Sequence, residues 1–254
     1  MSDPWVRKEV IGDCVLYQGS CLEIMPVLGS VDHVIGDPPY EKEAHRKDRR
    51  VMRRDGLVAG ALSFGEIGNQ REDVAKEVVR LSNGWTILFC QAEGVAPWRD
   101  ALEAAGAKYK APMVWVKPDG MPQFNGQGPG MGFESLVASW CVKGKSNWNG
   151  GGRHGVFTVP KGEGTKPVHE TQKPVRLMKE IVRLFTHEGQ TVLDPYCGSA
   201  STLVACAKMG RKGIGIELDP DYFNIACQRV EEAYRQPDMF VSPPSAPIQE
   251  GMDI

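Results

Sequence analysis

The feature of this sequence that most constrains its fold is the alternation of short strand-like runs with amphipathic helical patterns. Runs rich in β-branched and aromatic residues are separated by stretches whose apolar residues recur at helical spacing. This alternation predicts an α/β fold with a mostly parallel sheet that helices cover on both faces. The strands are expected at residues 14–18, 32–36, 85–90, 108–116, 135–142, 191–195 and 212–217.

Two of the expected helices are marked by signals at their ends. One opens at the Gln-Lys-Pro triplet 172–174 and is expected to stop at Gly189. The other has Asp219 as its N-cap and Pro220 at its first helical position. Apolar residues fall on one face of each helix, so both are predicted to pack on the sheet.

The chain is expected to form a single domain over residues 1–236. A length of 254 residues with 41% hydrophobic content can bury one substantial core. The charged stretch 41–70, a small Gly-rich insertion at about 143–168 and the Pro-rich stretch 237–254 interrupt the pattern. Long insertions in compact domains are usually functional or disordered, so we predict two functional loops and a flexible C-terminal tail.

Composition and charge argue against several classes of protein. The formal net charge of -2 argues against nucleic-acid binding through overall basicity, so such binding would need a local basic cluster. The seven cysteines are scattered without a C-x-x-C pair or zinc spacing, so neither disulfides nor a metal is expected. No signal peptide or membrane-crossing apolar run is found, which predicts a cytoplasmic protein without a membrane partner.

The segment most informative about chemistry is VIGDPPY at residues 34–40, an apolar strand followed by an acid, two prolines and an aromatic residue. Ligands bind at the C-terminal strand ends of open α/β sheets, and the prolines stiffen the backbone there. The Asp37 carboxylate and the Pro38 carbonyl could then grip both hydrogens of an exocyclic amine and free its lone pair. Tyr40 offers a face on which an extruded base could stack, whereas the simpler alternative is an ordinary turn after a strand.

A second segment, VLDPYCGSAST at residues 192–202, runs from a strand through small residues into a helix. Small residues allow close approach of a ligand, and the helix N-terminus favours a carboxylate. Glu217, at the end of the next strand, could accept hydrogen bonds from two ribose hydroxyls. Because the loop after this strand lacks the G-x-G-x-x-G pattern and Asp194 would repel a pyrophosphate, an adenosyl cofactor is favoured over a dinucleotide.

Three segments in this order resemble the β class of bacterial and phage DNA amino-methyltransferases: DPPY at 37–40, HETQKP at 169–174 and DPYCGS at 194–199. The resemblance covers roughly residues 14–235 and is more specific than any one motif. It implies a Rossmann-like methyltransferase fold in circularly permuted order, with the catalytic half before the cofactor half. The implied sheet has seven strands, one of them reversed, with 108–116 and 135–142 as its terminal hairpin.

The resemblance also implies roles for individual residues. The catalytic motif would be Asp37, Pro38, Pro39 and Tyr40. Residues expected to bind S-adenosylmethionine are Asp194, Tyr196, Cys197, Gly198 and Ser199 around its methionine part, Glu217 at its ribose, and His169, Thr171, Gln172 and Lys173 beside the following helix. Two positions depart from the family pattern: Ser20 stands where an acid often contacts the cofactor's adenine, and Ala200 stands where glycine is common.

Two groups of residues are expected to contact double-stranded DNA. The first follows the catalytic tyrosine and consists of Lys42, Arg46, Lys47, Arg49, Arg50, Arg53 and Arg54. The second consists of Lys143, Lys145, Trp148 and Arg153. Charge runs are usually solvated faces and Trp148 could be a packed surface aromatic, but the place of the first run favours phosphate contact. The short insertion leaves open whether specificity needs further loops or a partner chain, such as a second copy in a homodimer.

The function expected from these residues is site-specific DNA methylation of the restriction-modification kind. The methyl group would pass in line from S-adenosylmethionine to the exocyclic amine of a flipped base. Methylation of a cytosine ring carbon is disfavoured because no Pro-Cys pair occurs. The family's use of Asp at the first motif position favours adenine N6; cytosine N4, a protein or RNA substrate, and a catalytically silent DNA-binding module on the same scaffold stay open.

Overall fold

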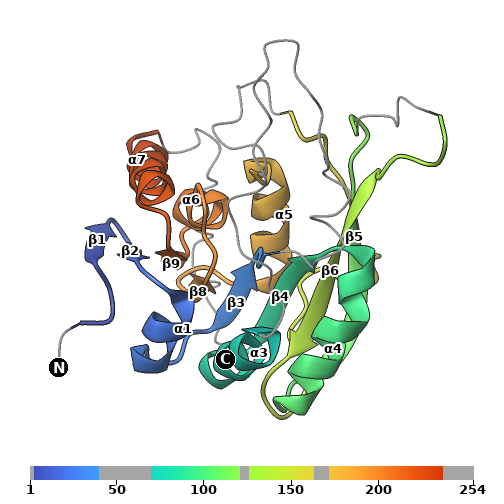
Figure 1. Cartoon of the computed structure of the whole chain (residues 1–254), viewed down its shortest axis with the longest axis horizontal. Helices are drawn as coiled ribbons and strands as arrows, with labels where there is room; N and C mark the ends of the chain where they lie inside the picture. Colours follow the sequence, from blue (N-terminus) through green and yellow to red (C-terminus); the bar gives the residue numbers. More distant parts are fainter. Residues whose placement is uncertain (1–2, 40–69, 121–125, 163–171, 237–254) are drawn as a thin grey trace, which may run out of the picture.

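A computed structural model describes residues 3–39, 70–120, 126–162 and 172–236 of the chain. Its strands form one sheet in the order β1-β2-β9-β8-β3-β4-β6-β5-β7 (Figure 1). The strands are β1 (Arg7–Ile11), β2 (Cys14–Gln18), β3 (His33–Gly36), β4 (Trp85–Cys90), β5 (Lys108–Val116), β6 (Phe133–Trp140), β7 (Val156–Thr158), β8 (Thr191–Asp194) and β9 (Lys212–Glu217). The helices are α1 (Cys21–Ile24), α3 (Arg71–Leu81), α4 (Val95–Ala104), α5 (Val175–Phe185), α6 (Ser201–Lys208) and α7 (Pro220–Arg235).

The predicted Rossmann-like sheet with one reversed strand is confirmed for the strands from β2 to β5 in spatial order. Strands β2, β9, β8, β3 and β4 run parallel, and β6 runs antiparallel to both of its neighbours, β4 and β5. The catalytic-half strand β3 pairs directly with β8 of the cofactor half. The expected permuted order of the two halves is therefore present.

The predicted strand number is corrected, because the described residues form a sheet of nine strands rather than seven. Strand β1 adds to one edge as a hairpin with β2, turned at Gly12, whose φ of 57° is accessible to glycine without strain. Strand β7 adds to the other edge, parallel to β5, and comes from the region predicted to be a recognition insertion. Both additions are short edge strands, which carry a weak sequence pattern.

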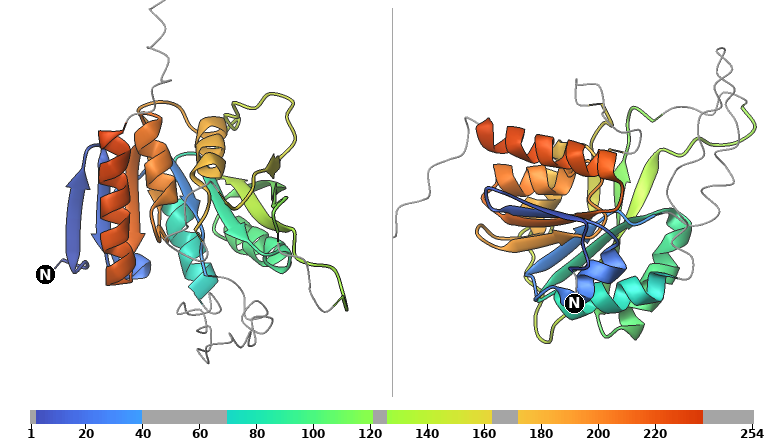
Figure 2. Two further views of the ribbon diagram at one scale, coloured as in Figure 1. Left: turned by 90° about the horizontal axis from the view of Figure 1, so that it is seen from above. Right: turned by 60° about the vertical axis from the view of Figure 1, so that its left-hand side comes forward.

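Helices cover both faces of the sheet, as predicted. Helices α1, α3 and α4 lie on one face and α5, α6 and α7 on the other (Figure 2). Consecutive strand residues alternate between the two cores: Val34 packs with the first group, whereas its neighbour Ile35 packs with α5. Central strands are therefore apolar on both sides, as expected for a parallel sheet that is buried on both faces.

The helix boundaries agree with the sequence signals at two of the three ends for which a signal was found. Asp219 caps α7, its side chain accepting hydrogen bonds from the amides of Asp221 and Tyr222. Helix α5 begins after Pro174 but ends at Phe185, before the expected stop at Gly189. The Asn149 side chain donates hydrogen bonds to the carbonyls of Arg183 and Thr186 there, so side-chain capping takes the place of a glycine cap.

Within the described ranges, none of the helices is long and apolar enough to cross a bilayer. The predicted basic loop 41–70, apart from residue 70, and the predicted tail 237–254 lie outside the described residues. The predicted insertion 143–168 is described up to residue 162.

Candidate active site

Asp37 lies immediately after β3, at the C-terminal edge of the parallel strands. Pro38 is buried behind it, and Pro39 is half-buried. A quarter of the Asp37 side chain is exposed, yet its Oδ1 atom is buried and no described residue donates a hydrogen bond to it. Tyr40, the last residue of the predicted motif, lies outside the described residues. The site therefore presents a buried carboxylate oxygen that has no donor within the described part of the chain.

The cofactor-half loop lies beside Asp37, because β3 and β8 are parallel neighbours. Val34 pairs with Leu193, so both strands end at the same edge. A Cβ added at Gly36 would lie 3.1 Å from Cδ of Pro195 and 3.5 Å from Oδ1 of Asp194. Glycine at position 36 thus permits close packing of the two motifs, which the sequence predicted to share one site.

Glu217 connects the loop after β8 to the end of β9. Its Oε2 accepts a hydrogen bond from the amide of Gly198 at 2.8 Å, and its Oε1 accepts one from the amide of Asp219 at 2.8 Å. Each carboxylate oxygen still has a second acceptor site. Ser20, which follows β2 and precedes α1, lies beside this strand end, since the Gly19 amide donates to the Glu217 carbonyl at 2.9 Å.

The backbone of the small-residue loop is held in an unusual conformation. Gly198 has a φ of 50°, and Ala200 has a φ of 61°, the one positive φ among non-glycine residues in the described ranges. Left-handed backbone at an alanine is strained, typically by about 1–2 kcal/mol. This explains physically why the family commonly has glycine at the position of Ala200. The hydroxyl of Ser199 accepts a hydrogen bond from Arg229 of α7, so this side chain is engaged within the protein.

Four charged side chains of alternating sign meet at this edge of the sheet. Lys173, just before α5, donates to Oδ2 of Asp37 and lies 3.3 Å from Oε2 of Glu134. Glu134 of β6 in turn accepts a hydrogen bond from Lys117, which follows β5. Lys173 was expected to line the cofactor; its ammonium contacts the predicted catalytic acid, and its contact with the cofactor stays a prediction.

The pKa directions within this chain follow from burial and from neighbouring charge. Burial raises the pKa of Asp37, opposed by Lys173 and reinforced by Glu134. Burial alone would lower the pKa of Lys173, but the carboxylates of Asp37 and Glu134 outweigh it and raise that pKa. Burial also lowers the pKa of Lys117, against the pull of Glu134. Lys173 is therefore a cation at neutral pH.

Asp194 is held by the loop that follows it. Its Oδ2 accepts from the Thr202 hydroxyl at 2.5 Å and its Oδ1 from the Tyr196 amide at 3.1 Å. Burial nevertheless raises its pKa to about 7, and the nearby carboxylates of Asp37 and Glu217 add to this rise. Burial similarly raises the pKa of the Cys197 thiol well above its usual range, so this side chain is a neutral thiol.

Replacing Asp194 with asparagine is expected to stabilise the protein without cofactor, most strongly above pH 7. The raised pKa means that folding disfavours the Asp194 anion, and this destabilisation grows from the ordinary pKa of 3.8 up to about pH 7. Without the charge, the asparagine oxygen can still accept from the Tyr196 amide, and its NH2 group can donate to the Thr202 hydroxyl in place of accepting from it. We expect Tm to rise by about 2–4 °C at pH 8 and by less at pH 5, measured by circular dichroism. An equal change at both pH values would contradict this explanation.

The second predicted DNA-contact group is not grouped with Asp37. Lys143 and Lys145 follow the end of β6, and because β6 is reversed, that end lies at the opposite edge of the sheet. The Trp148 ring packs against Phe185 at 4.8 Å, and its indole N–H donates to the Gly151 carbonyl. Arg153 forms an ion pair with Glu180 of α5. The packed-aromatic alternative for Trp148 is thus supported.

The remaining predicted site residues are distributed as follows. Gln172 precedes Lys173, and its Oε1 is buried without a donor among the described residues. The residues of the first DNA-contact group, with His169 and Thr171, fall outside the described ranges. Within the described part, no cluster of His, Cys, Asp and Glu side chains could hold a metal ion.

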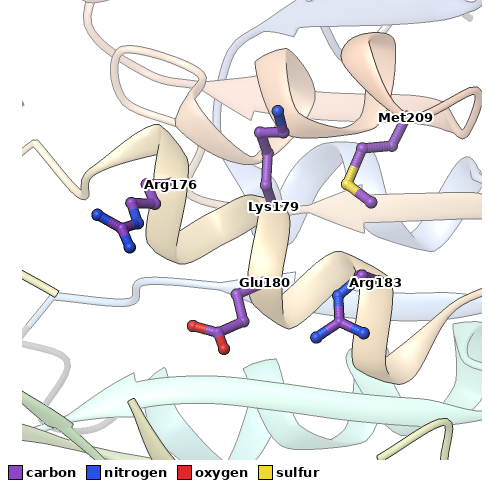
Figure 3. A pocket seen from close by; sticks show the side chains of 5 residues that line it. All are labelled: Arg176, Lys179, Glu180, Arg183 and Met209. Atoms are coloured by element: carbon purple, nitrogen blue, oxygen red, sulfur yellow. The ribbon is translucent and has the colours of Figure 1, made fainter. Parts of the chain in front are cut away.

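A hollow on the outer side of α5 is separate from this site. Figure 3 shows its lining: Arg176, Lys179, Glu180, Arg183 and Met209. Four of these residues belong to α5 and Met209 follows α6. The hollow contains no residue of the three motifs.

Glu134 and Lys117 were missed by the sequence predictions. Both could have been found from the predicted hairpin, because the start of its second strand must lie beside the end of its first. Trp115 pairs with Glu134, and Lys117 comes two residues later. A carboxylate at the start of an otherwise apolar strand, FESLVASW, was the available signal.

Comparisons with known proteins agree with this arrangement. A family model described as DNA methylase, of the N6 and N4 type, matches residues 31–228. The type II methyltransferase M.Cfr9I of Citrobacter freundii is 31% identical over 270 residues, which cover 87% of this chain and 89% of the relative. The structure of M1.HpyAVI in complex with SAM has a TM-score of 0.67 at 24% identity, over 85% of this chain and 98% of that one. The PvuII methyltransferase, described as cytosine-N4-specific, also has a TM-score of 0.67, at 14% identity, over 91% of this chain and 95% of that one.

Proposed function

This chain belongs to the family of S-adenosylmethionine-dependent DNA amino-methyltransferases, and we propose that within it the chain methylates adenine N6 at a specific DNA sequence. The observation that carries this proposal is the buried Oδ1 of Asp37, an acceptor to which no described residue donates, beside the cofactor-half loop. An acid rather than serine at the first motif position supports adenine over cytosine, by analogy with the family. The type II relatives support a role as a modification enzyme.

The residues at the ends of β8 and β9 fit S-adenosylmethionine. Glu217 retains acceptor capacity for two ribose hydroxyls while its bonds to the amides of Gly198 and Asp219 hold it in place. The Gly198 loop leaves backbone exposed to close approach, since a Cβ there would meet no atom within 4 Å. When bound, the cofactor supplies a methyl group on a positively charged sulfur, which the Asp194 and Glu217 carboxylates suit electrostatically.

Asp37 acts on the amine that receives the methyl group. In the proposed mechanism, Oδ1 of Asp37 and the carbonyl of Pro38 accept the two amine hydrogens, so the nitrogen lone pair points away from them toward the methyl carbon. After transfer the nitrogen carries one proton too many, and Oδ1 of Asp37 is the nearest acceptor for it. Burial, which raises the Asp37 pKa, makes this carboxylate a better base than an exposed one.

The test is incubation of the purified protein with methyl-labelled S-adenosylmethionine and unmethylated genomic DNA. We expect labelled N6-methyladenine in the nucleoside digest, and single-molecule sequencing then gives the recognition sequence. N4-methylcytosine as the product would assign the alternative base. Tight DNA binding without incorporation would instead support a silent module on the same scaffold.

A further inference from the structure

We propose that Lys173 is a positioning residue for Asp37: its ammonium holds Oδ2, which leaves Oδ1 directed to the substrate amine, and Glu134 with Lys117 balances its charge. This inference rests on the proposed function for its chemical meaning. It concerns side chains on four different elements, at the ends of β3 and β5, at the start of β6 and before α5.

Lys173 is fixed from several sides. Its side chain is 7% exposed, its ammonium lies between the carboxylates of Asp37 and Glu134, and it sits 5.0 Å from the centre of the Phe89 ring. Pro174 restricts the backbone of Lys173 to extended conformations. A long lysine side chain normally loses much rotamer freedom when it is held, so such an arrangement is unusual for a merely solvated charge.

The two carboxylate oxygens of Asp37 have different surroundings, which gives them different roles in this proposal. Oδ2 receives the hydrogen bond from Lys173, whereas Oδ1 is buried and receives none from any described residue. A carboxylate held by one oxygen can rotate little about its terminal bond, so its other oxygen keeps one direction. The amine of an extruded base would supply the missing donor at Oδ1.

The neighbours of Asp37 act on it in opposite directions. Burial raises its pKa, Lys173 and Lys117 lower it, and Glu134 raises it again. Asp194, on the adjacent strand, is a further charged neighbour among the described residues, since the Asp37 charge raises the pKa of Asp194. Removing Lys173 should therefore raise the Asp37 pKa, and neutralising Glu134 should lower it. A residue that only fills space would produce neither effect.

The experiment compares Lys173→Met and Glu134→Gln with the wild type, using Lys212→Met as the matched control. Lys212 is exposed at the start of β9, at the opposite edge of the sheet. We expect kcat for DNA methylation to fall about 100-fold in Lys173→Met, as for other misplaced catalytic groups, with the affinity for S-adenosylmethionine retained. The acid limb of the pH profile should move to higher pH in Lys173→Met and to lower pH in Glu134→Gln.

A second measurement does not depend on activity. The Asp37 carboxyl is titrated by carbon-13 NMR in protein labelled at aspartate, with its resonance assigned by its loss in Asp37→Ala. We expect the Asp37 pKa to rise in Lys173→Met and to fall in Glu134→Gln. Lys173→Arg keeps the charge but not the shape, so its Asp37 pKa should be closer to the wild-type value than its kcat is. An unchanged Asp37 titration in Lys173→Met, or shifts of both variants in one direction, would overturn the inference. If the wild type transfers no methyl group, the proposed function fails, while this titration still decides the pairing.

Discussion

Replacing Asp37 with alanine is expected to lower the rate of methyl transfer about 10³-fold, the upper range for loss of one preorganised polar group. In the proposed mechanism the carboxylate contacts the amine mainly as the lone pair is freed, so its loss should act on the transition state more than on binding of either substrate. The affinity for S-adenosylmethionine, measured by isothermal titration calorimetry, should change less than about tenfold. Incorporation of labelled methyl groups into DNA under single-turnover conditions measures the rate.

The control for this variant is Asp100→Ala. Asp100 is exposed on α4, pairs with Arg99 and belongs to none of the three motifs. The Asp100→Ala protein should methylate DNA at the wild-type rate. If Asp37→Ala lost cofactor affinity as strongly as rate, the carboxylate would belong to cofactor binding, and the catalytic assignment would be wrong.

Replacing Glu217 with alanine is expected to weaken S-adenosylmethionine binding about 10²–10³-fold. A hydrogen bond to a charged group contributes about 1.5–3 kcal/mol, and two ribose hydroxyls would lose their common acceptor. The same change removes the acceptors for the amides of Gly198 and Asp219, so the loop that approaches the cofactor also loses its support. Calorimetric titration with S-adenosylmethionine measures the loss.

Glu231→Ala serves as the matched control on α7. Glu231 is exposed and pairs with Arg235 at 3.0 Å, and such surface pairs contribute about 0–1 kcal/mol to stability. We expect it to bind the cofactor as the wild type does. A Glu217→Ala protein that remained folded and bound S-adenosylmethionine normally would show that the ribose is held elsewhere.

Much of the sheet was predictable because its strands carry strong local signals. The bounds of β4, β5 and β9 agree with the predicted ranges, and β4 is the clearest case, a run of mostly β-branched and aromatic residues. Strand β6 begins two residues earlier than predicted, at Phe133. The backbone of β6 pairs with β5 through hydrogen bonds that do not depend on the side chains, so the strand continues through the charged Glu134.

The candidate site was predictable in its motifs but not in its contacts. Asp37, Gly198 and Glu217 could be placed at one edge, because parallel strands end together. The contact of Lys173 with Asp37 could not be predicted, because it depends on the direction in which this long side chain points, just before Pro174. Lys143 and Lys145 lie away from Asp37 for a topological reason: the reversed direction of β6 takes the chain to the opposite edge of the sheet before they occur.

The adjacency of β3 and β8 has a consequence for how the protein acquires its activity. The residues that pair there, Val34 with Leu193, are separated by most of the chain, and β2 with β9 joins segments still further apart. Such long-range pairings form late and slowly during folding, because the entropy of closing a large loop is lost before the contacts stabilise it. A partly folded intermediate that lacks these two pairings has no complete catalytic centre, so methylation competence arises only with the fully assembled sheet.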